Sequence, residues 1–215
     1  MRLLDGYELV IFDCDGVLVD SERLAVEVEA RVLTDLGWPI TPTEVVERFV
    51  GRSSEDALAE IERHLGAART AEFDRVSSEQ IIAAFYDRLV PVEGVAGVVE
   101  RLHGAGVSTC VASSGSYRKM DLTLGLTGLL DTFAGRIFSA DDVANGKPAP
   151  DLFLHAAASL GVEPARCAVI EDSVPGVLAA GTAGMTCFGF TSGLAAPGVL
   201  ADAGAVPFAT MTELF

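Results

Sequence analysis

The chain has 215 residues, half of them hydrophobic, which suits one sizeable domain or one domain with a smaller insert. Acidic residues outnumber basic ones by 31 to 15, and the formal charge of −16 leaves no basic footprint for nucleic acid or anionic lipid. No apolar run reaches the roughly 20 residues of a membrane helix, and acidic residues interrupt the first apolar stretch, unlike a secretory signal.

The four cysteines are scattered, without the paired spacing of a metal site or the pattern of a secreted disulfide scaffold. We therefore expect reduced cysteines in a cytoplasmic protein that binds neither nucleic acid nor membrane. A monomer or a weak homo-oligomer is expected.

The first predicted element is a short buried strand at Leu9–Phe12, which ends abruptly in Asp-Cys-Asp-Gly at residues 13–16. From about residue 20 to residue 90, helical periodicity dominates and no strand is indicated. This interval predicts a helical insert that would act as a lid. We expect an α/β core at residues 1–19 and 91–215, and a helical cap at residues 20–90.

After residue 91, strand-like and helical patterns alternate. Continuous apolar runs predict strands at Val107–Ala112, Arg136–Ser139, Cys167–Ile170 and Thr186–Phe190. Helical patterns occur at Val95–His103, Tyr117–Leu124, Asp151–Leu160 and Pro175–Ala183. Such alternation predicts a doubly wound α/β fold with a parallel sheet.

Polar groups follow four of the predicted strands. They are Asp13, Asp15 and Gly16 after the first strand, Ser113 and Ser114 after the second, Lys147 beyond the third, and Glu171 and Asp172 after the fourth. Because ligands of open α/β sheets bind outside the carboxyl ends of the strands, these segments should converge on one rim.

The combination of these groups suits phosphoryl transfer. Four carboxyl groups at one rim require a cation, and hard oxygen ligands favour Mg²⁺. Asp13 can then attack a phosphoryl group, and Asp15 can act as acid and base. Gly16 lets backbone N–H groups approach the phosphate, while Ser113 and Lys147 provide a hydroxyl and a positive charge. Lys147 is one of only two lysines in a chain that otherwise uses arginine.

The segments FDCDGVLVDSE, VASSGS, GKPAPD and VIEDSVPGVLAAGTAGM resemble, in order and spacing, the four signature motifs of the haloacid-dehalogenase-like hydrolase superfamily. The resemblance covers nearly the whole chain and implies a Rossmann-like core with a small helical cap. It implies Asp13 as nucleophile, Asp15 as acid and base, Ser113 as phosphate-binding hydroxyl and Lys147 as the motif lysine. It also implies Mg²⁺ ligands from the Asp13 and Asp172 carboxylates and the Asp15 carbonyl, with Glu171 a further ligand or an outer-shell acceptor.

The superfamily contains several activities, and departures from their patterns favour hydrolysis. Dehalogenase members lack the second aspartate, and phosphonate-cleaving members use a cap lysine that this cap lacks. The β-phosphoglucomutase-type sugar-phosphate mutases resemble the chain in the cap loop GRSSEDAL, but carry a histidine near Ala25 and an arginine near Ser54. The resemblance thus implies a Mg²⁺-dependent phosphatase with an aspartyl-phosphate intermediate, and the mutase is the alternative.

A phospho-receiver module is a second, non-enzymatic alternative, because receivers share the sheet, the acidic cluster, the hydroxyl and the lysine. Receivers are far shorter and have no helical insert after the first strand. As substrate we expect a small phosphorylated metabolite, such as a sugar phosphate or a similar phosphate monoester. Predicted substrate contacts are Gly16 and Ser114 in the core, with Arg52, Ser53, Ser54 and Glu22 in the cap.

Overall fold

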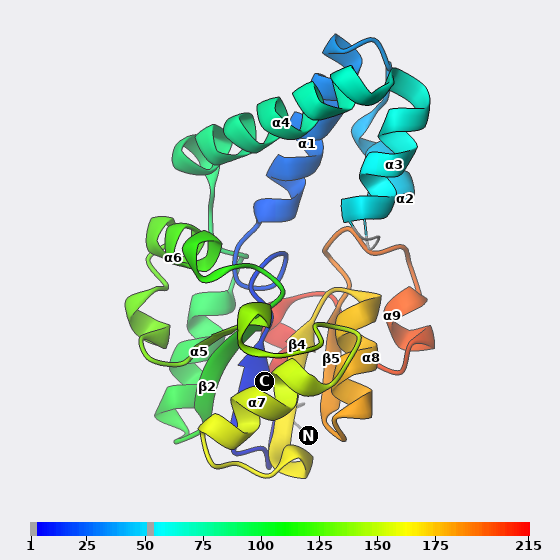
Figure 1. Ribbon diagram of the computed structural model, residues 1–215. Helices are drawn as coiled ribbons and strands as arrows, with labels where there is room; N and C mark the ends of the chain where they lie inside the picture. Colours follow the sequence, from blue (N-terminus) through cyan, green and yellow to red (C-terminus); the bar gives the residue numbers. More distant parts are fainter. Residues whose placement is uncertain (1–3, 51–53) are drawn as a thin grey trace. The chain divides into compact units, whose positions relative to one another are not determined.

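A computed structural model describes residues 4–50 and 54–215 (Figure 1). The chain divides into two compact units. One comprises Met1–Asp20 with Val90–Phe215 and is called the core unit below; the other comprises Ser21–Leu89 and is called the cap unit. Each is described by itself.

The core unit is built on a six-stranded sheet in the order β3-β2-β1-β4-β5-β6, and every neighbouring pair is parallel. The strands are β1 (Leu9–Phe12), β2 (Ser108–Ser113), β3 (Ile137–Ser139), β4 (Cys167–Glu171), β5 (Thr186–Phe190) and β6 (Val206–Phe208). The predicted doubly wound α/β fold is confirmed. The chain runs from β1 to β2 and β3 on one side and then crosses back to β4, β5 and β6 on the other side, which makes the end of β1 a topological switch point.

Helices connect the strands of the core unit. They are α5 (Val95–Gly104), α6 (Tyr117–Leu126), α7 (Asp151–Ser159), α8 (Val174–Thr182) and α9 (Val199–Asp202), with short 3₁₀ turns at Asp131–Phe133, Ala140–Asp142, Pro164–Arg166 and Met211–Leu214. The edge strand β6 was not predicted, because its sequence is only Val-Pro-Phe. A proline cannot donate to a sheet ladder and is tolerated at an edge.

Both faces of the central strand are buried, as the unbroken apolar sequence of β1 requires. Leu9 and Ile11 belong to a cluster that includes Leu152 and Phe153 of α7 and Val177 of α8. The intervening Val10 and Phe12 are also fully buried, on the opposite face of the sheet. The short strand is therefore fixed on two sides, so the residues that follow it have a well-defined position.

The cap unit consists of α1 (Ser21–Asp35), α2 (Pro42–Phe49), α3 (Ser54–Leu65) and α4 (Ala67–Arg88). Thr41 begins α2 with a capping box, in which the Thr41 hydroxyl accepts from the Glu44 N–H and the Glu44 carboxylate accepts from the Thr41 N–H. Trp38 stacks on His64 with ring centroids 3.8 Å apart, which joins the connection after α1 to α3.

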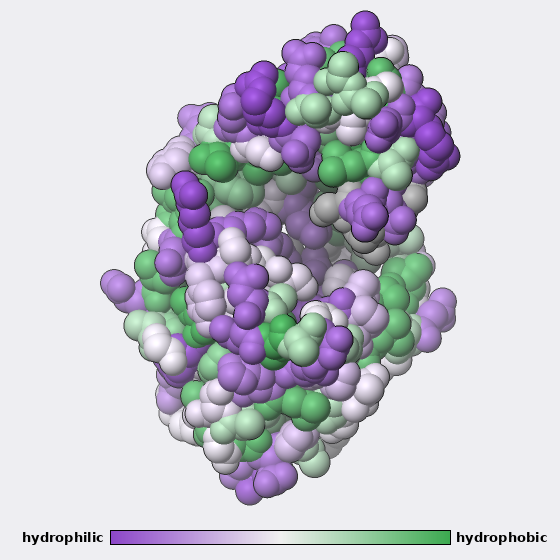
Figure 2. All heavy atoms as spheres, in the orientation of Figure 1, coloured by the Kyte–Doolittle hydropathy of each residue, from purple (hydrophilic) through white to green (hydrophobic). Residues whose placement is uncertain are grey.

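On the face shown in Figure 2, hydrophilic residues are interspersed with smaller hydrophobic patches. Within the described ranges, no helix combines the length and the apolar character needed to cross a membrane. All four cysteines are buried free thiols.

Candidate active site

Lys147 ties together the ends of three strands. Its ammonium donates to Asp13 Oδ1 at 2.5 Å, to Glu171 Oε1 at 2.7 Å and to the carbonyl of Ala112 at 3.0 Å. These acceptors follow or end β1, β4 and β2, and the lysine side chain is 3% exposed. An ammonium has three N–H donors, so all three are used within the protein.

Glu171 is placed to hold Lys147 and the loop after β4. One carboxylate oxygen accepts from Lys147, and the other accepts from the N–H groups of Asp172 and Ser173 and from the Ser173 hydroxyl, at 2.8–2.9 Å. The residue is 1% exposed. Both oxygens are therefore occupied by protein donors, which matches an outer-shell acceptor better than a direct metal ligand.

The buried charges at this rim are unbalanced. Burial raises the pKa of Asp13 to about 7, an effect that Lys147 opposes and Glu171 reinforces. Burial alone would lower the pKa of Lys147, but the carboxylates of Asp13 and Glu171 outweigh it, so the pKa rises and the ammonium stays charged. Two carboxylates sharing one ammonium leave one negative charge uncompensated, which a bound cation would neutralise.

Asp172 packs directly on Gly16. A Cβ atom built on Gly16 would lie 1.9 Å from Asp172 Oδ2, and one built on Gly193 would lie 3.1 Å from the same oxygen. Gly16 also has φ +76°, a left-handed conformation that side-chain-bearing residues rarely adopt. The glycine in the first motif is thus required twice: for its backbone conformation and for the space that Asp172 fills.

Asp15 and Ser113 converge on Gly115. A Cβ atom at Gly115 would lie 3.4 Å from Ser113 Oγ and 3.7 Å from Asp15 Oδ2, so the two side chains face the same short loop. Ser113 is buried at the end of β2, and its hydroxyl accepts from the Gly115 N–H at 3.1 Å. Ser114, the next residue, is exposed.

Two features of this loop were not singled out from the sequence. Lys119, in the first turn of α6, donates to Asp15 Oδ2 at 2.8 Å. The buried Ser139 hydroxyl at the end of β3 donates to the Gly115 carbonyl at 2.8 Å and so holds the loop from the other side. The rarity of lysine in this chain was a signal for Lys119; nothing in the sequence marked Ser139.

The donor set fits a magnesium ion. Within residues 4–50 and 54–215, no three His, Cys, Asp or Glu side chains lie together as a self-sufficient metal cage. Mg²⁺ does not require one, because it keeps several waters and is held by one or two carboxylates together with substrate phosphate. The buried Asp13 and Asp172 supply two carboxylates, and the uncompensated charge beside Lys147 favours a cation.

The predicted cap contacts belong to a different part of the chain from the core residues above. Arg52 and Ser53 lie outside the described residues, and Ser54 is the first residue of α3. Glu22 lies in the first turn of α1, in the cap unit. Their proposed roles stay predictions.

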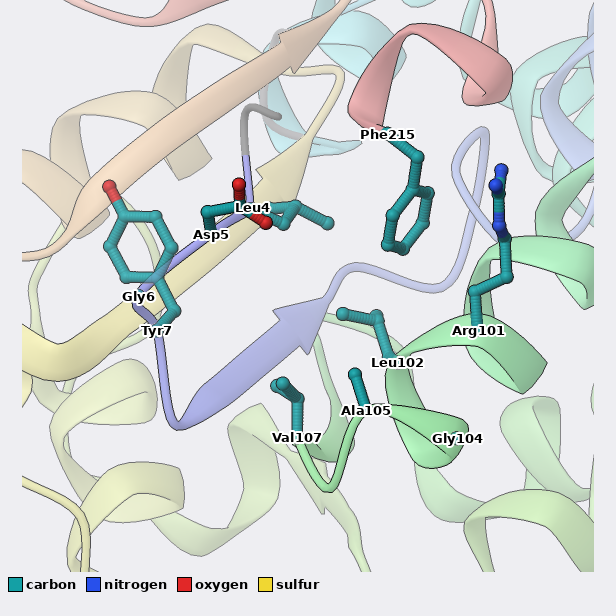
Figure 3. Close-up of a pocket in the computed structure, with 10 residues that line it drawn as sticks. All are labelled: Leu4, Asp5, Gly6, Tyr7, Arg101, Leu102, Gly104, Ala105, Val107 and Phe215. Carbon is teal, nitrogen blue, oxygen red and sulfur yellow. The ribbon is translucent and has the colours of Figure 1, made fainter. Parts of the chain in front are cut away.

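A cavity of about 480 Å³ lies elsewhere in the core unit (Figure 3). Its lining comes from residues before β1, from the end of α5 and from Phe215, whose ring lies 4.8 Å from the Arg101 guanidinium. The first segment precedes β1 and the second precedes β2, so the cavity lies at the amino ends of these strands. Asp13, Ser113 and Glu171 lie at the carboxyl ends, where ligands of such sheets bind.

Comparison with known proteins places the chain in a family. Residues 7–184 match the model of the haloacid dehalogenase-like hydrolase family. The chain is 31% identical over 185 residues to 6-phosphogluconate phosphatase of Escherichia coli (strain K12), covering 85% of this chain and 82% of the relative.

Solved structures of haloacid dehalogenase-like proteins have a similar fold. The haloacid dehalogenase-like protein ATU0790 of Agrobacterium tumefaciens str. C58 is 39% identical with a TM-score of 0.86, covering 97% of this chain and 96% of the other. A β-phosphoglucomutase-like structure from Thermotoga maritima is 31% identical with a TM-score of 0.81, covering 96% of each chain. With the parallel sheet, the motif order and the match over residues 7–184 in agreement, this chain belongs to the haloacid dehalogenase-like hydrolase family.

Proposed function

We propose that this chain is a Mg²⁺-dependent phosphatase that hydrolyses a small phosphate monoester through an aspartyl-phosphate on Asp13. The observation that carries the proposal is the contact between the Lys147 ammonium and Asp13, with Glu171 and the Ala112 carbonyl holding the lysine in place. A fixed, buried carboxylate beside a permanent positive charge suits a nucleophile that must face a phosphate dianion.

Asp13, Lys147 and Asp15 have different roles in the proposed reaction. With Asp13 Oδ1 held by Lys147, Oδ2 is the oxygen that attacks phosphorus. The bond to the leaving oxygen breaks as Asp15 gives it a proton. In the second half, Asp15 takes a proton from water, the water oxygen bonds to phosphorus, and the acyl-phosphate bond to Asp13 breaks. Asp13 and Asp172 are the residues that would hold Mg²⁺, which would supply Lewis-acid polarisation of the phosphate oxygens.

We propose a sugar phosphate or a similar metabolite as substrate, and a cytoplasmic location. The similarity to 6-phosphogluconate phosphatase supports the substrate class. Arg52, Ser53, Ser54 and Glu22 are proposed to contact the leaving group. The first three belong to a cap loop that resembles the specificity loop of relatives, and Glu22 lies close in sequence to the start of the cap.

The decisive test compares Asp13→Asn with Asp141→Asn, an exposed acid that follows β3. Phosphate release from a panel of phosphorylated metabolites and an aryl phosphate is measured with MgCl₂ and with EDTA. The Asp13 variant should lose at least about 10³-fold in turnover, because an amide cannot attack phosphorus. Near-wild-type turnover in that variant would refute the assignment, whereas the Asp141 variant should keep its activity.

The mutase is the second candidate, and the similarity to the β-phosphoglucomutase-like structure favours it. Phosphorus NMR with a hexose 1-phosphate separates the two: a phosphatase releases inorganic phosphate, and a mutase yields the isomeric hexose phosphate. Sustained phosphate release over many turnovers would also exclude a phospho-receiver, which accepts one phosphoryl group per molecule.

A further inference from the structure

Lys119 makes a contact that the proposed mechanism leaves unused. Its ammonium lies 2.8 Å from Asp15 Oδ2, across 104 residues of sequence, and the Lys119 side chain is 43% exposed. The aliphatic part also packs at the loop, since a Cβ atom at Gly115 would lie 3.6 Å from Lys119 Cδ. The Lys119 side chain therefore lies along the loop that follows Ser113 and reaches Asp15, the proposed acid and base.

The two lysines of the chain have different partners. Lys147 holds Asp13, the proposed nucleophile, and Lys119 holds Asp15, the proposed proton donor. The Lys119 contact pairs an ammonium with a carboxylate at 2.8 Å. An ammonium donates hydrogen bonds and accepts none.

This one-way hydrogen bond distinguishes the two oxygens of Asp15. An oxygen that accepts from Lys119 must present a lone pair to it. When Asp15 is a carboxylic acid, its carbonyl oxygen is a better acceptor than its hydroxyl oxygen, so the contact with the ammonium favours the proton on Oδ1. The contact also limits rotation of the carboxyl group about its last side-chain bond, which keeps Oδ1 in one direction.

We propose that Lys119 is a positioning residue that fixes the Asp15 carboxyl group so that Oδ1 delivers the proton to the leaving oxygen. The inference rests on the proposed phosphatase function. Lys119 itself exchanges no proton. In the first half-reaction the phosphoryl group is transferred from the leaving oxygen to Asp13 Oδ2, and a proton is transferred from Asp15 Oδ1 to the leaving oxygen. In the second half-reaction Asp15 takes a new proton from the water that attacks phosphorus, and the bond between phosphorus and Asp13 Oδ2 breaks.

The proposal predicts a dependence on the leaving group. An alkoxide leaves only with a proton, whereas 4-nitrophenolate is stable without one. A misplaced Asp15 should therefore impair alkyl phosphates and spare 4-nitrophenyl phosphate. A merely structural defect, or the loss of a positive charge near the substrate, would impair both.

The test uses Lys119→Met, which removes the charge but keeps most of the length of the side chain, and Lys119→Arg, which keeps the charge. Arg118→Met is the matched control, since Arg118 is the adjacent exposed cation on α6. For each variant, kcat/KM is measured for 4-nitrophenyl phosphate and for the best alkyl phosphate found with the wild type. This parameter reports the first phosphoryl transfer, so slow hydrolysis of the aspartyl-phosphate does not mask the effect.

We expect Lys119→Met to lower kcat/KM for the alkyl ester by about 10²-fold, within the usual range for a proton donor, and by less than about 3-fold for 4-nitrophenyl phosphate. Lys119→Arg should recover part of the loss, Arg118→Met should change neither value, and inhibition by orthovanadate should be unchanged. Equal losses on both esters, or no loss on the alkyl ester, would overturn the role of Lys119 while leaving the phosphatase intact. A wild type that releases no phosphate would overturn the proposed function itself.

Discussion

Gly16 shows how strongly one position of the site is constrained. Its φ of +76° and the 1.9 Å separation between a built Cβ atom and Asp172 Oδ2 are independent obstacles to any side chain. The first is a backbone cost that many glycines of this chain share. The second is specific, because it would displace a proposed magnesium ligand.

Gly16→Ala should therefore raise the magnesium concentration needed for half-maximal activity by about 10-fold or more, as expected when a ligand of a cation with strict geometry is moved. The thermal stabilisation by MgCl₂, measured without substrate, should shrink in parallel. Gly128→Ala is the control, since Gly128 has φ +74° but nothing within 4 Å of a built Cβ atom. If both variants keep the wild-type magnesium dependence, Asp172 is not held by this glycine for metal binding.

For single residues of the site, the sequence predicts which residues take part better than it predicts which side chains contact one another. Asp13, Ser113, Lys147 and Glu171 could be singled out because each follows or ends a predicted strand, and strand ends of a parallel sheet share an edge. The contact of Lys119 with Asp15 could not, because it depends on how α6 returns across the loop after β2. The occupation of both Glu171 oxygens likewise depends on the turn into α8.

The junction between β4 and α8 is the most tightly packed element boundary of the site. Ser173 caps α8, its hydroxyl accepting from the Gly176 N–H at 3.2 Å. Gly176 itself lies against the Glu171 carboxylate, so that a Cβ atom there would lie 1.8 Å from Oε1 and 1.9 Å from Cδ. The first turn of α8 therefore packs closely against Glu171, the residue that accepts a hydrogen bond from Lys147.

Gly176→Ala should lower the melting temperature and abolish most activity, because either Glu171 must move away from its four protein donors or the helix must shift. The expected cost is several kcal/mol, as for other overpacked buried sites. Gly181→Ala on the same helix has open space and should be neutral or stabilising by about 0.5–1 kcal/mol. Thermal unfolding followed by circular dichroism distinguishes them, and similar melting temperatures for both variants would contradict the packing described.

Elements with long buried runs were predictable, and short edge elements were not. The strands β1, β2, β4 and β5 each have four or five consecutive buried residues, most of them apolar, which is typical of strands covered on both faces. The strand β6 has three residues with a proline in the middle, so that only pairing with β5 makes it a strand. The start of β2 was also predicted one residue early, at Val107, because the pattern marks burial and not hydrogen bonding.

For the molecule as a whole, the dominant property is charge. The excess of 31 acidic over 15 basic residues gives −16, while the proposed substrate and its phosphate product are also anionic. The acidic side chains of such a protein repel one another in the folded state. Salt weakens this repulsion, because the screening length is about 10 Å at 0.1 M ionic strength.

The melting temperature should therefore rise by about 2–4 °C between 10 and 200 mM NaCl in the presence of EDTA, corresponding to about 1 kcal/mol of relieved repulsion. Choline chloride at equal ionic strength serves as the control and should act alike, because screening does not depend on which cation provides it. A fall in melting temperature with salt would show that local ion pairs outweigh the net charge.

The seclusion of Lys147 also matters for chemical labelling. Acylating reagents attack accessible, uncharged amines, and an ammonium that is 3% exposed and engaged by three acceptors meets neither condition. The other lysine, Lys119, differs in that its side chain is 43% exposed, so a fluorescent ester should attach there more readily than at Lys147, with the amino group of the N-terminus as the competing site. A dye on Lys119 would lie beside the proposed proton donor, where its signal could report ligand entry without any engineered cysteine.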